Sequence, residues 1–160
     1  MKAQPLLYLE TSIFGFYYDE QPANQHRRHA VISLLRQVHT GQFKAVTSSV
    51  TKDELRAAPE PLATRLIELL ADVADLQLDD DAVEQLAEAY IAEGIVPRKF
   101  ADDARHVACA TIGRVEILVS LNLKHIANEW SERRINSINL REGYSLLSIR
   151  TPEEVIRYED

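Results

Sequence analysis

Three acidic residues in this 160-residue chain occupy positions from which carboxylates can gather around a cation. Glu10 directly follows a short apolar run, and Glu54 and Asp103 are expected in the first turns of two later helices. Asn122, just past another apolar run, offers a further oxygen. Crowded carboxylates raise one another's pKa values unless a cation compensates their charge. Oxygen ligands with little histidine or cysteine suit Mg²⁺ or Mn²⁺ better than zinc, and such a site suits phosphodiester hydrolysis.

Each of these residues also has a purely structural interpretation. Glu54 matches a capping box with Thr51, which its spacing alone favours. Asp102 and Asp103 would complement a helix dipole, and the asparagine suits a turn. His106, one turn after Asp103, is expected to be a packed, hydrogen-bonded histidine rather than a ligand. Only the joint placement of the acids therefore indicates a site.

The elements that must position these residues alternate between strands and helices. Apolar runs predict strands at residues 6–9, 43–47, 73–78, 115–120 and 144–149. Helical spacing and start signals predict helices over 24–39, 62–70 and 81–94, and others that open near residues 51, 101, 124 and 151. This alternation predicts an α/β fold with a mostly parallel sheet covered on both faces. The carboxyl ends of the strands then form the edge at which ligands bind.

Length and composition favour one globular domain, residues 1–160, with 46% hydrophobic and 27% charged residues. No apolar run is long enough to span a membrane, and the first residues lack a signal-peptide core, so we expect a cytoplasmic protein. Cys109 is expected to be a small buried residue rather than a nucleophile. The net charge of −7 argues against a broad basic surface for nucleic acid, but an enzyme with acidic metal ligands stays compatible with it.

Four blocks of the sequence resemble a known family. They are YLETSIFGFYYDE, VTSSVTKDEL, DDARHVACATIGRVEILVSLNLKHIAN and GYSLLSIRTPEEV. In this order they resemble PIN-domain proteins, specifically the VapC-like toxins of bacterial type II toxin–antitoxin pairs. The similarity runs through nearly the whole chain. The third block is the most specific part of the match, and Glu54 by itself is only weak evidence for it.

The resemblance implies a three-layer α/β/α fold with a sheet of about five strands, and an endoribonuclease that depends on Mg²⁺ or Mn²⁺. It also implies RNA as substrate, a homodimer and a cognate antitoxin protein as partner. By the same match, Glu10, Glu54 and Asp103 are the metal ligands, and Asn122 stands where many members carry a fourth catalytic acid.

The match also assigns supporting residues and shows departures. Ser12 and Ser120 would support the ligands by hydrogen bonds, and Asp102 is at most a supporting residue. Glu10 stands where aspartate is usual, and the neutral asparagine at 122 puts binding of a second metal in doubt. Leu121 replaces an expected aromatic residue.

Two other functions are weighed against the nuclease. The first is a PIN-like fold that dimerises or holds a partner and cleaves nothing; the substituted Glu10, the neutral Asn122 and the acidic surface favour it. The second, a haloacid-dehalogenase-type phosphatase, is disfavoured because the first strand lacks a nucleophilic aspartate followed by an acid two residues on.

Overall fold

The structure is a computed structural model that describes residues 4–157. In this part of the chain, five parallel strands form a single sheet in the order β3-β2-β1-β4-β5. The strands are β1 (Leu6–Leu9), β2 (Lys44–Thr47), β3 (Val73–Asp75), β4 (Ile117–Val119) and β5 (Ser148–Arg150). All four strand pairings are parallel. The predicted α/β fold with a parallel sheet of about five strands is therefore confirmed.

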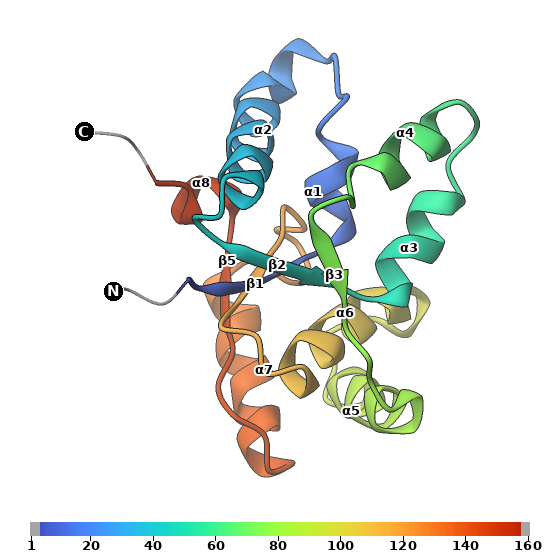
Figure 1. The fold of residues 1–160 in the computed structure, drawn as a ribbon. Helices are drawn as coiled ribbons and strands as arrows, with labels where there is room; N and C mark the ends of the chain where they lie inside the picture. The colour runs from blue at the N-terminus through green and yellow to red at the C-terminus, as the bar shows by residue number, and fades with distance from the viewer. Residues whose placement is uncertain (1–3, 158–160) are drawn as a thin grey trace.

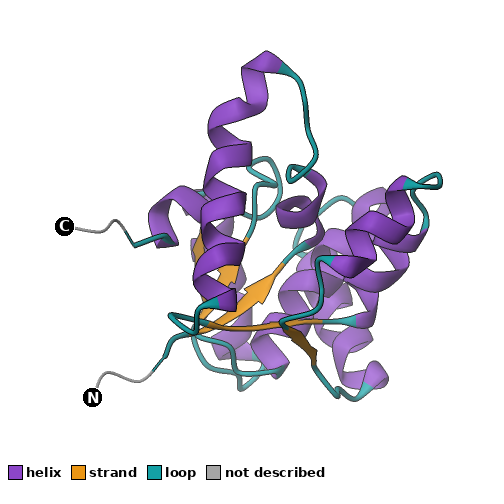
Figure 2. Cartoon of the chain, turned by 45° about the horizontal axis from the view of Figure 1, so that its top comes forward, coloured by secondary structure: helices purple, strands orange, loops and turns teal. Residues whose placement is uncertain are grey.

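Helices cover both faces of this sheet (Figures 1 and 2). They are α1 (Thr11–Gly15), α2 (Gln25–His39), α3 (Ser49–Arg56), α4 (Leu62–Glu68), α5 (Asp80–Ala92), α6 (Ala101–Ile112), α7 (Glu129–Arg141) and α8 (Pro152–Val155), with short 3-10 turns at Pro22–Asn24 and Arg98–Phe100. Over residues 4–157, no helix has the length and apolar character needed to cross a membrane.

The three layers follow from the alternation of side chains along β1, its central strand. Leu7 and Leu9 face the core shared with α1 and α2, whereas Tyr8 faces the core shared with α5, α6 and α7. All three side chains are fully buried. A parallel strand covered on both faces needs apolar residues at every position, and β1 has them.

Helix α6 lies in the second of these cores with small residues along its buried side. Ala104, Ala108 and Ala110 are fully buried, and Cys109 is 3% exposed. Burial raises the pKa of the Cys109 thiol to about 11, which keeps it protonated and unreactive near neutral pH. Cys109 is thus buried, as the sequence predicted.

The starts of two helices differ from the sequence-based predictions. Helix α3 begins at Ser49 with Ser48 as its N-cap, because the chain turns directly from β2 into the helix, so Thr51 does not cap it. Helix α5 is capped by Asp79, whose carboxylate accepts from the next backbone amides, and not by Asp81. The capping box of Thr151 and Glu154 on α8 is confirmed.

Other differences concern element lengths near the sheet edges. The predicted strands 73–78 and 144–149 contain hydrogen-bonded strand only at Val73–Asp75 and Ser148–Arg150. Both lie at the edges of the sheet, where only one neighbour supports pairing. Helix α1 was not predicted; it is five residues long, too short for helical spacing to show.

Candidate active site

The candidate site lies where the chain reverses its direction across the sheet. From β1 the chain proceeds to β2 and β3 on one side, and later places β4 and β5 on the other. In open α/β sheets, the crevice outside the carboxyl ends of the strands at such a switch point is the usual ligand site. Glu10 follows β1, and its backbone amide donates to the carbonyl of Val119 at the end of β4, 3.1 Å away.

The Glu10 carboxylate is held in place by hydroxyl groups from both sides of this crevice. Ser12 Oγ and Ser120 Oγ donate to its Oε1 at 2.5 and 2.6 Å. The two hydroxyl oxygens in turn accept the backbone N–H groups of Leu121 and Asn122 at 2.8 and 2.9 Å. With Glu10 only 5% exposed, this network fixes the orientation of a nearly buried carboxylate.

Glu54 reaches the same edge from the second turn of α3, where it pairs with a buried histidine. Its Oε1 accepts from Thr11 Oγ1 at 2.8 Å and lies 2.5 Å from Nε2 of His106. The other ring nitrogen of His106, Nδ1, lies 2.8 Å from the Tyr8 hydroxyl, which is 2.7 Å from Ser48 Oγ. A chain of polar contacts thus runs from Glu54 into the core beneath the sheet edge.

Electrostatics favour the charged forms of both Glu54 and His106. Burial lowers the pKa of His106, but the hydrogen bond with Glu54 and the charges of Glu10, Glu54 and Asp103 outweigh burial and raise it. For Glu54, burial raises the pKa, but the hydrogen bond and charge of His106, with the bond from Thr11, outweigh it and lower the pKa. All three acids that the sequence singled out therefore act on one buried imidazole.

Asp103 lies in the first turn of α6, as predicted, and contacts a second histidine. Its Oδ2 is 2.8 Å from Nδ1 of His125. The ring of His125 packs against Phe100, with 4.8 Å between ring centroids. Asn122 orders this loop, because its Oδ1 accepts the backbone N–H of His125 at 3.1 Å and its carbonyl oxygen accepts two further amides. The structural interpretation of Asn122 as a turn residue thus describes its present contacts.

The donor chemistry fits a hard divalent cation, because the site offers carboxylate and hydroxyl oxygens. The present positions of these side chains, however, do not form a metal site. In the described part of the chain, no three histidine, cysteine, aspartate or glutamate side chains form a group that could hold a metal ion. Glu54 and Asp103 each contact a histidine instead. A cation bound by all three acids would therefore require a rearrangement of the present side chains.

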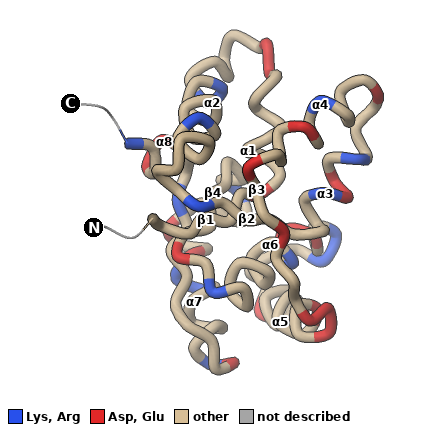
Figure 3. The backbone as a smooth tube through the Cα atoms, in the orientation of Figure 1, with Lys and Arg blue, Asp and Glu red and all other residues tan. Residues whose placement is uncertain are grey.

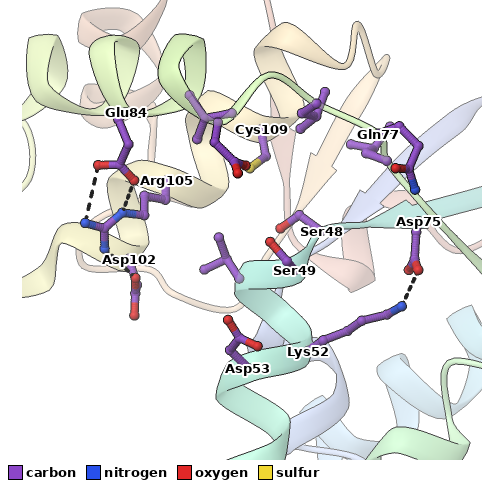
Figure 4. A pocket seen from close by; sticks show the side chains of 15 residues that line it. Ser48, Ser49, Lys52, Asp53, Asp75, Gln77, Glu84, Asp102, Arg105 and Cys109 are labelled. Carbon is purple, nitrogen blue, oxygen red and sulfur yellow. Dashed lines mark hydrogen bonds and ion pairs between the residues drawn. The ribbon is translucent and has the colours of Figure 1, made fainter.

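A cavity of about 690 Å³ lies between α3, α5 and α6 (Figure 4). Asp53 and Asp102, the neighbours of Glu54 and Asp103, line it. Arg105 pairs with Asp102 and with Glu84, both at 2.7 Å. The structure thus places Asp102 against this arginine on the cavity wall. The other lining cation, Lys52, pairs with Asp75, so both cations of the cavity are engaged by carboxylates.

The wider surface carries both signs of charge. Figure 3 shows acidic and basic residues interspersed over both helical layers. This agrees with the net charge of −7, which argued against a broad basic surface. Recognition of a polyanion would therefore depend on a few local cations rather than on the overall field.

Comparison with known proteins adds no family to this picture. A scan against protein-family models gives no match, and a search of curated proteins gives none either. The PIN-domain resemblance accordingly stays a hypothesis that rests on the residues quoted above.

Sequence reasoning singled out the acids but missed most of their partners. Thr11 lies between Glu10 and Ser12, so its place in the same turn was visible. His106 follows Asp103 by three residues, a spacing that places both on one helix face. Tyr8 and His125 gave no usable signal, because their roles depend on contacts between segments far apart in the sequence.

Proposed function

We propose that the protein is a divalent-cation-dependent endoribonuclease, the toxin of a type II toxin–antitoxin pair. One observation carries the proposal: carboxylates from three separate segments come to the switch point of the sheet, with Glu10 after β1, Glu54 against the buried His106 and Asp103 in the first turn of α6. Carboxylates gathered near one another repel, and such clustering is typical of functional sites. The resemblance to VapC-like toxins supports the assignment to RNA.

In this proposal Glu10, Glu54 and Asp103 hold the cation, and Asn122 contributes an oxygen near them. A bound Mg²⁺ or Mn²⁺ stabilises charge on the phosphoryl oxygens and lowers the pKa of water. The chain itself orients these ligands. Ser12 and Ser120 hold the Glu10 carboxylate, His106 contacts Glu54, and His125 contacts Asp103. No side chain acts as a covalent nucleophile.

Titration of the purified protein with Mn²⁺ by calorimetry tests the metal site. We expect the wild type to bind Mn²⁺ and Asp103→Asn to lose that binding together with Mn²⁺-dependent RNA cleavage. Asp102→Asn is the matched control, since it removes one charge from the adjacent residue, which contacts Arg105. Equal loss in both variants, or full RNA cleavage by Asp103→Asn, would contradict the proposed ligand set.

The partners belong to the proposal as well. We propose a cytoplasmic homodimer bound by a small antitoxin protein. Light scattering on the purified chain measures the dimer, and a small antitoxin-like reading frame beside the gene identifies the partner. A monomer in solution would contradict the homodimer, and the lack of such a reading frame would contradict the antitoxin. Neither result would bear on the nuclease chemistry, which the Mn²⁺ titration tests.

A second function is favoured by the pairing of the acids with histidines. Because no three metal-ligating side chains among residues 4–157 form a group that could hold a cation, a PIN-like module that binds a partner without cleaving RNA is the alternative. Its signature is a wild type that binds neither Mn²⁺ nor Mg²⁺, cleaves no RNA, and still forms a stable complex with itself or with a partner.

A further inference from the structure

An aromatic ring lies exposed beside the Asp103 end of the site. Phe100 ends the 3-10 turn that leads into α6, three residues before Asp103, and it is 40% exposed. Its ring centroid is 4.8 Å from that of His125, and His125 bonds Asp103. The ring therefore touches the side chain that orients one of the acids, while a large part of its surface faces water.

One lysine lies over the Phe100 ring, and a second is the sequence neighbour of His125. The Nζ atom of Lys99 lies over the Phe100 ring, 5.1 Å from its centroid, and Lys124 directly precedes His125 and is exposed. Neither lysine forms an ion pair with a carboxylate of the described residues. Nearby Arg98 differs, because its guanidinium contacts Glu88 at 2.6 Å.

This combination has the chemistry of a nucleotide subsite. Proteins that bind single-stranded nucleic acid stack bases on exposed aromatic rings and place cations along the backbone. A long, flexible lysine that now covers the ring can move to a phosphate when a base takes its place. In a chain with net charge −7, contacts with phosphates would depend on local cations such as these two lysines.

We propose that Phe100 forms a stacking subsite for an unpaired base of single-stranded RNA, with Lys99 and Lys124 contacting its phosphates. The inference rests on the proposed nuclease function, because it takes RNA as the ligand and places the next phosphodiester toward Asp103. A stacking subsite of this kind selects single-stranded RNA, because bases inside an RNA duplex are stacked on one another and offer no free face.

Binding is measured without cleavage, by fluorescence anisotropy of a labelled eight-nucleotide single-stranded RNA in EDTA. We expect Phe100→Ala to weaken binding about 10-fold and Phe100→Trp to retain or tighten it, since stacking on an aromatic face is sequence-tolerant but strong. Leu146→Ala is the matched control: Leu146 is 65% exposed and precedes β5, so it lies toward the amino ends of the parallel strands, whereas the site lies at their carboxyl ends. We expect it to bind as the wild type does.

The lysines are tested by salt dependence. Two phosphate contacts on a single strand contribute about 1.4 to the slope of log K against log salt concentration. Replacing both residues, Lys99→Gln with Lys124→Gln, is expected to reduce the slope by about that amount. An unchanged slope would exclude them as phosphate contacts.

The outcomes separate this inference from the nuclease. If the wild type cleaves RNA but Phe100→Ala binds the oligonucleotide as tightly as wild type, the stacking subsite is wrong and the nuclease stands. If binding depends on Phe100 but no RNA is cleaved with Mn²⁺, the subsite stands and the nuclease fails. If Phe100→Ala changes only the oligomeric state in light scattering, the ring serves a protein interface and the subsite is overturned.

Discussion

Glu54 and His106 approach within 2.5 Å, Oε1 to Nε2, where α3 meets α6 beneath the carboxyl edge of the sheet. The imidazole is fully buried, and the glutamate side chain is 34% exposed. The pair therefore joins a solvent-accessible carboxylate to the core through Tyr8. The orientation of one candidate ligand, Glu54, thus depends on His106, which would not itself bind the cation.

Loss of His106 should destabilise the fold. His106→Ala removes a hydrogen-bond partner from the Glu54 carboxylate and from the buried Tyr8 hydroxyl, which keep only Thr11 and Ser48. We expect the free energy of unfolding to fall by about 2–3 kcal/mol. Urea denaturation measures it. His39→Ala is the control, because His39 pairs with Asp72 at 2.9 Å on the surface, with side chains 73% and 49% exposed; its expected cost is under about 0.5 kcal/mol. Equal costs would show that the buried pair adds nothing.

The same pair predicts how stability depends on pH in metal-free protein. The pKa of His106 is raised on folding, so its contribution is complete below about pH 6.5 and is lost as pH rises through the higher folded value. The pKa of Glu54 is lowered, so its contribution is complete above about pH 4.5 and is lost as pH falls through the folded value. The contribution of the pair is therefore greatest between these two pH values.

Thermal unfolding in EDTA across pH tests this directly. The difference in Tm between wild type and His106→Ala should be largest near pH 5.5 and should shrink at alkaline pH. A difference that stays constant from pH 5 to pH 9 would mean that His106 acts only by packing.

Ser12 and Ser120 should act together on Glu10, because both hydroxyls donate to Oε1. In a double-mutant cycle of Ser12→Ala and Ser120→Ala, we expect each single change to cost about 1–2 kcal/mol and the pair to show a coupling energy of about 1 kcal/mol. Chemical denaturation of the four proteins supplies the cycle. Strict additivity would indicate that the two hydroxyls hold separate features rather than one carboxylate.

Asn122→Asp tests the departure of this chain from the family pattern. Aspartate keeps an oxygen that can accept the His125 amide, as Asn122 Oδ1 does now at 3.1 Å, so the loop should persist. The added negative charge beside the acids should tighten Mn²⁺ binding about 10-fold or more, because carboxylates are stronger ligands for hard cations than amides are. Calorimetry with unchanged or weaker Mn²⁺ affinity would place Asn122 outside the metal site.

The sequence was sufficient for the fold class and for part of the site. Apolar runs that alternate with helical spacing predicted the parallel sheet. The polar residues directly after β1 and β4 were predicted to lie together at the carboxyl ends of the strands. Glu10, Ser12 and Ser120 come together there. The prediction of His106 as a packed, hydrogen-bonded histidine is confirmed. Its pairing with Glu54 was not predicted, because the two residues are far apart along the chain. Local spacing also misplaced the start of α3, where the strand-to-helix turn at Ser48 overrode the capping-box pattern.

The central position of β1 affects the order in which the protein is made. This strand is synthesised before the other four, yet one of its two neighbours is β4, and the Glu10 carboxylate accepts a hydrogen bond from Ser120, which directly follows β4. Until the ribosome has passed residue 120, one edge of β1 stays unpaired and the Glu10 carboxylate lacks its hydrogen bond from Ser120. For the proposed ribonuclease, this means that Glu10 lacks the support of Ser120 in a nascent chain until β4 and the residue after it have been made.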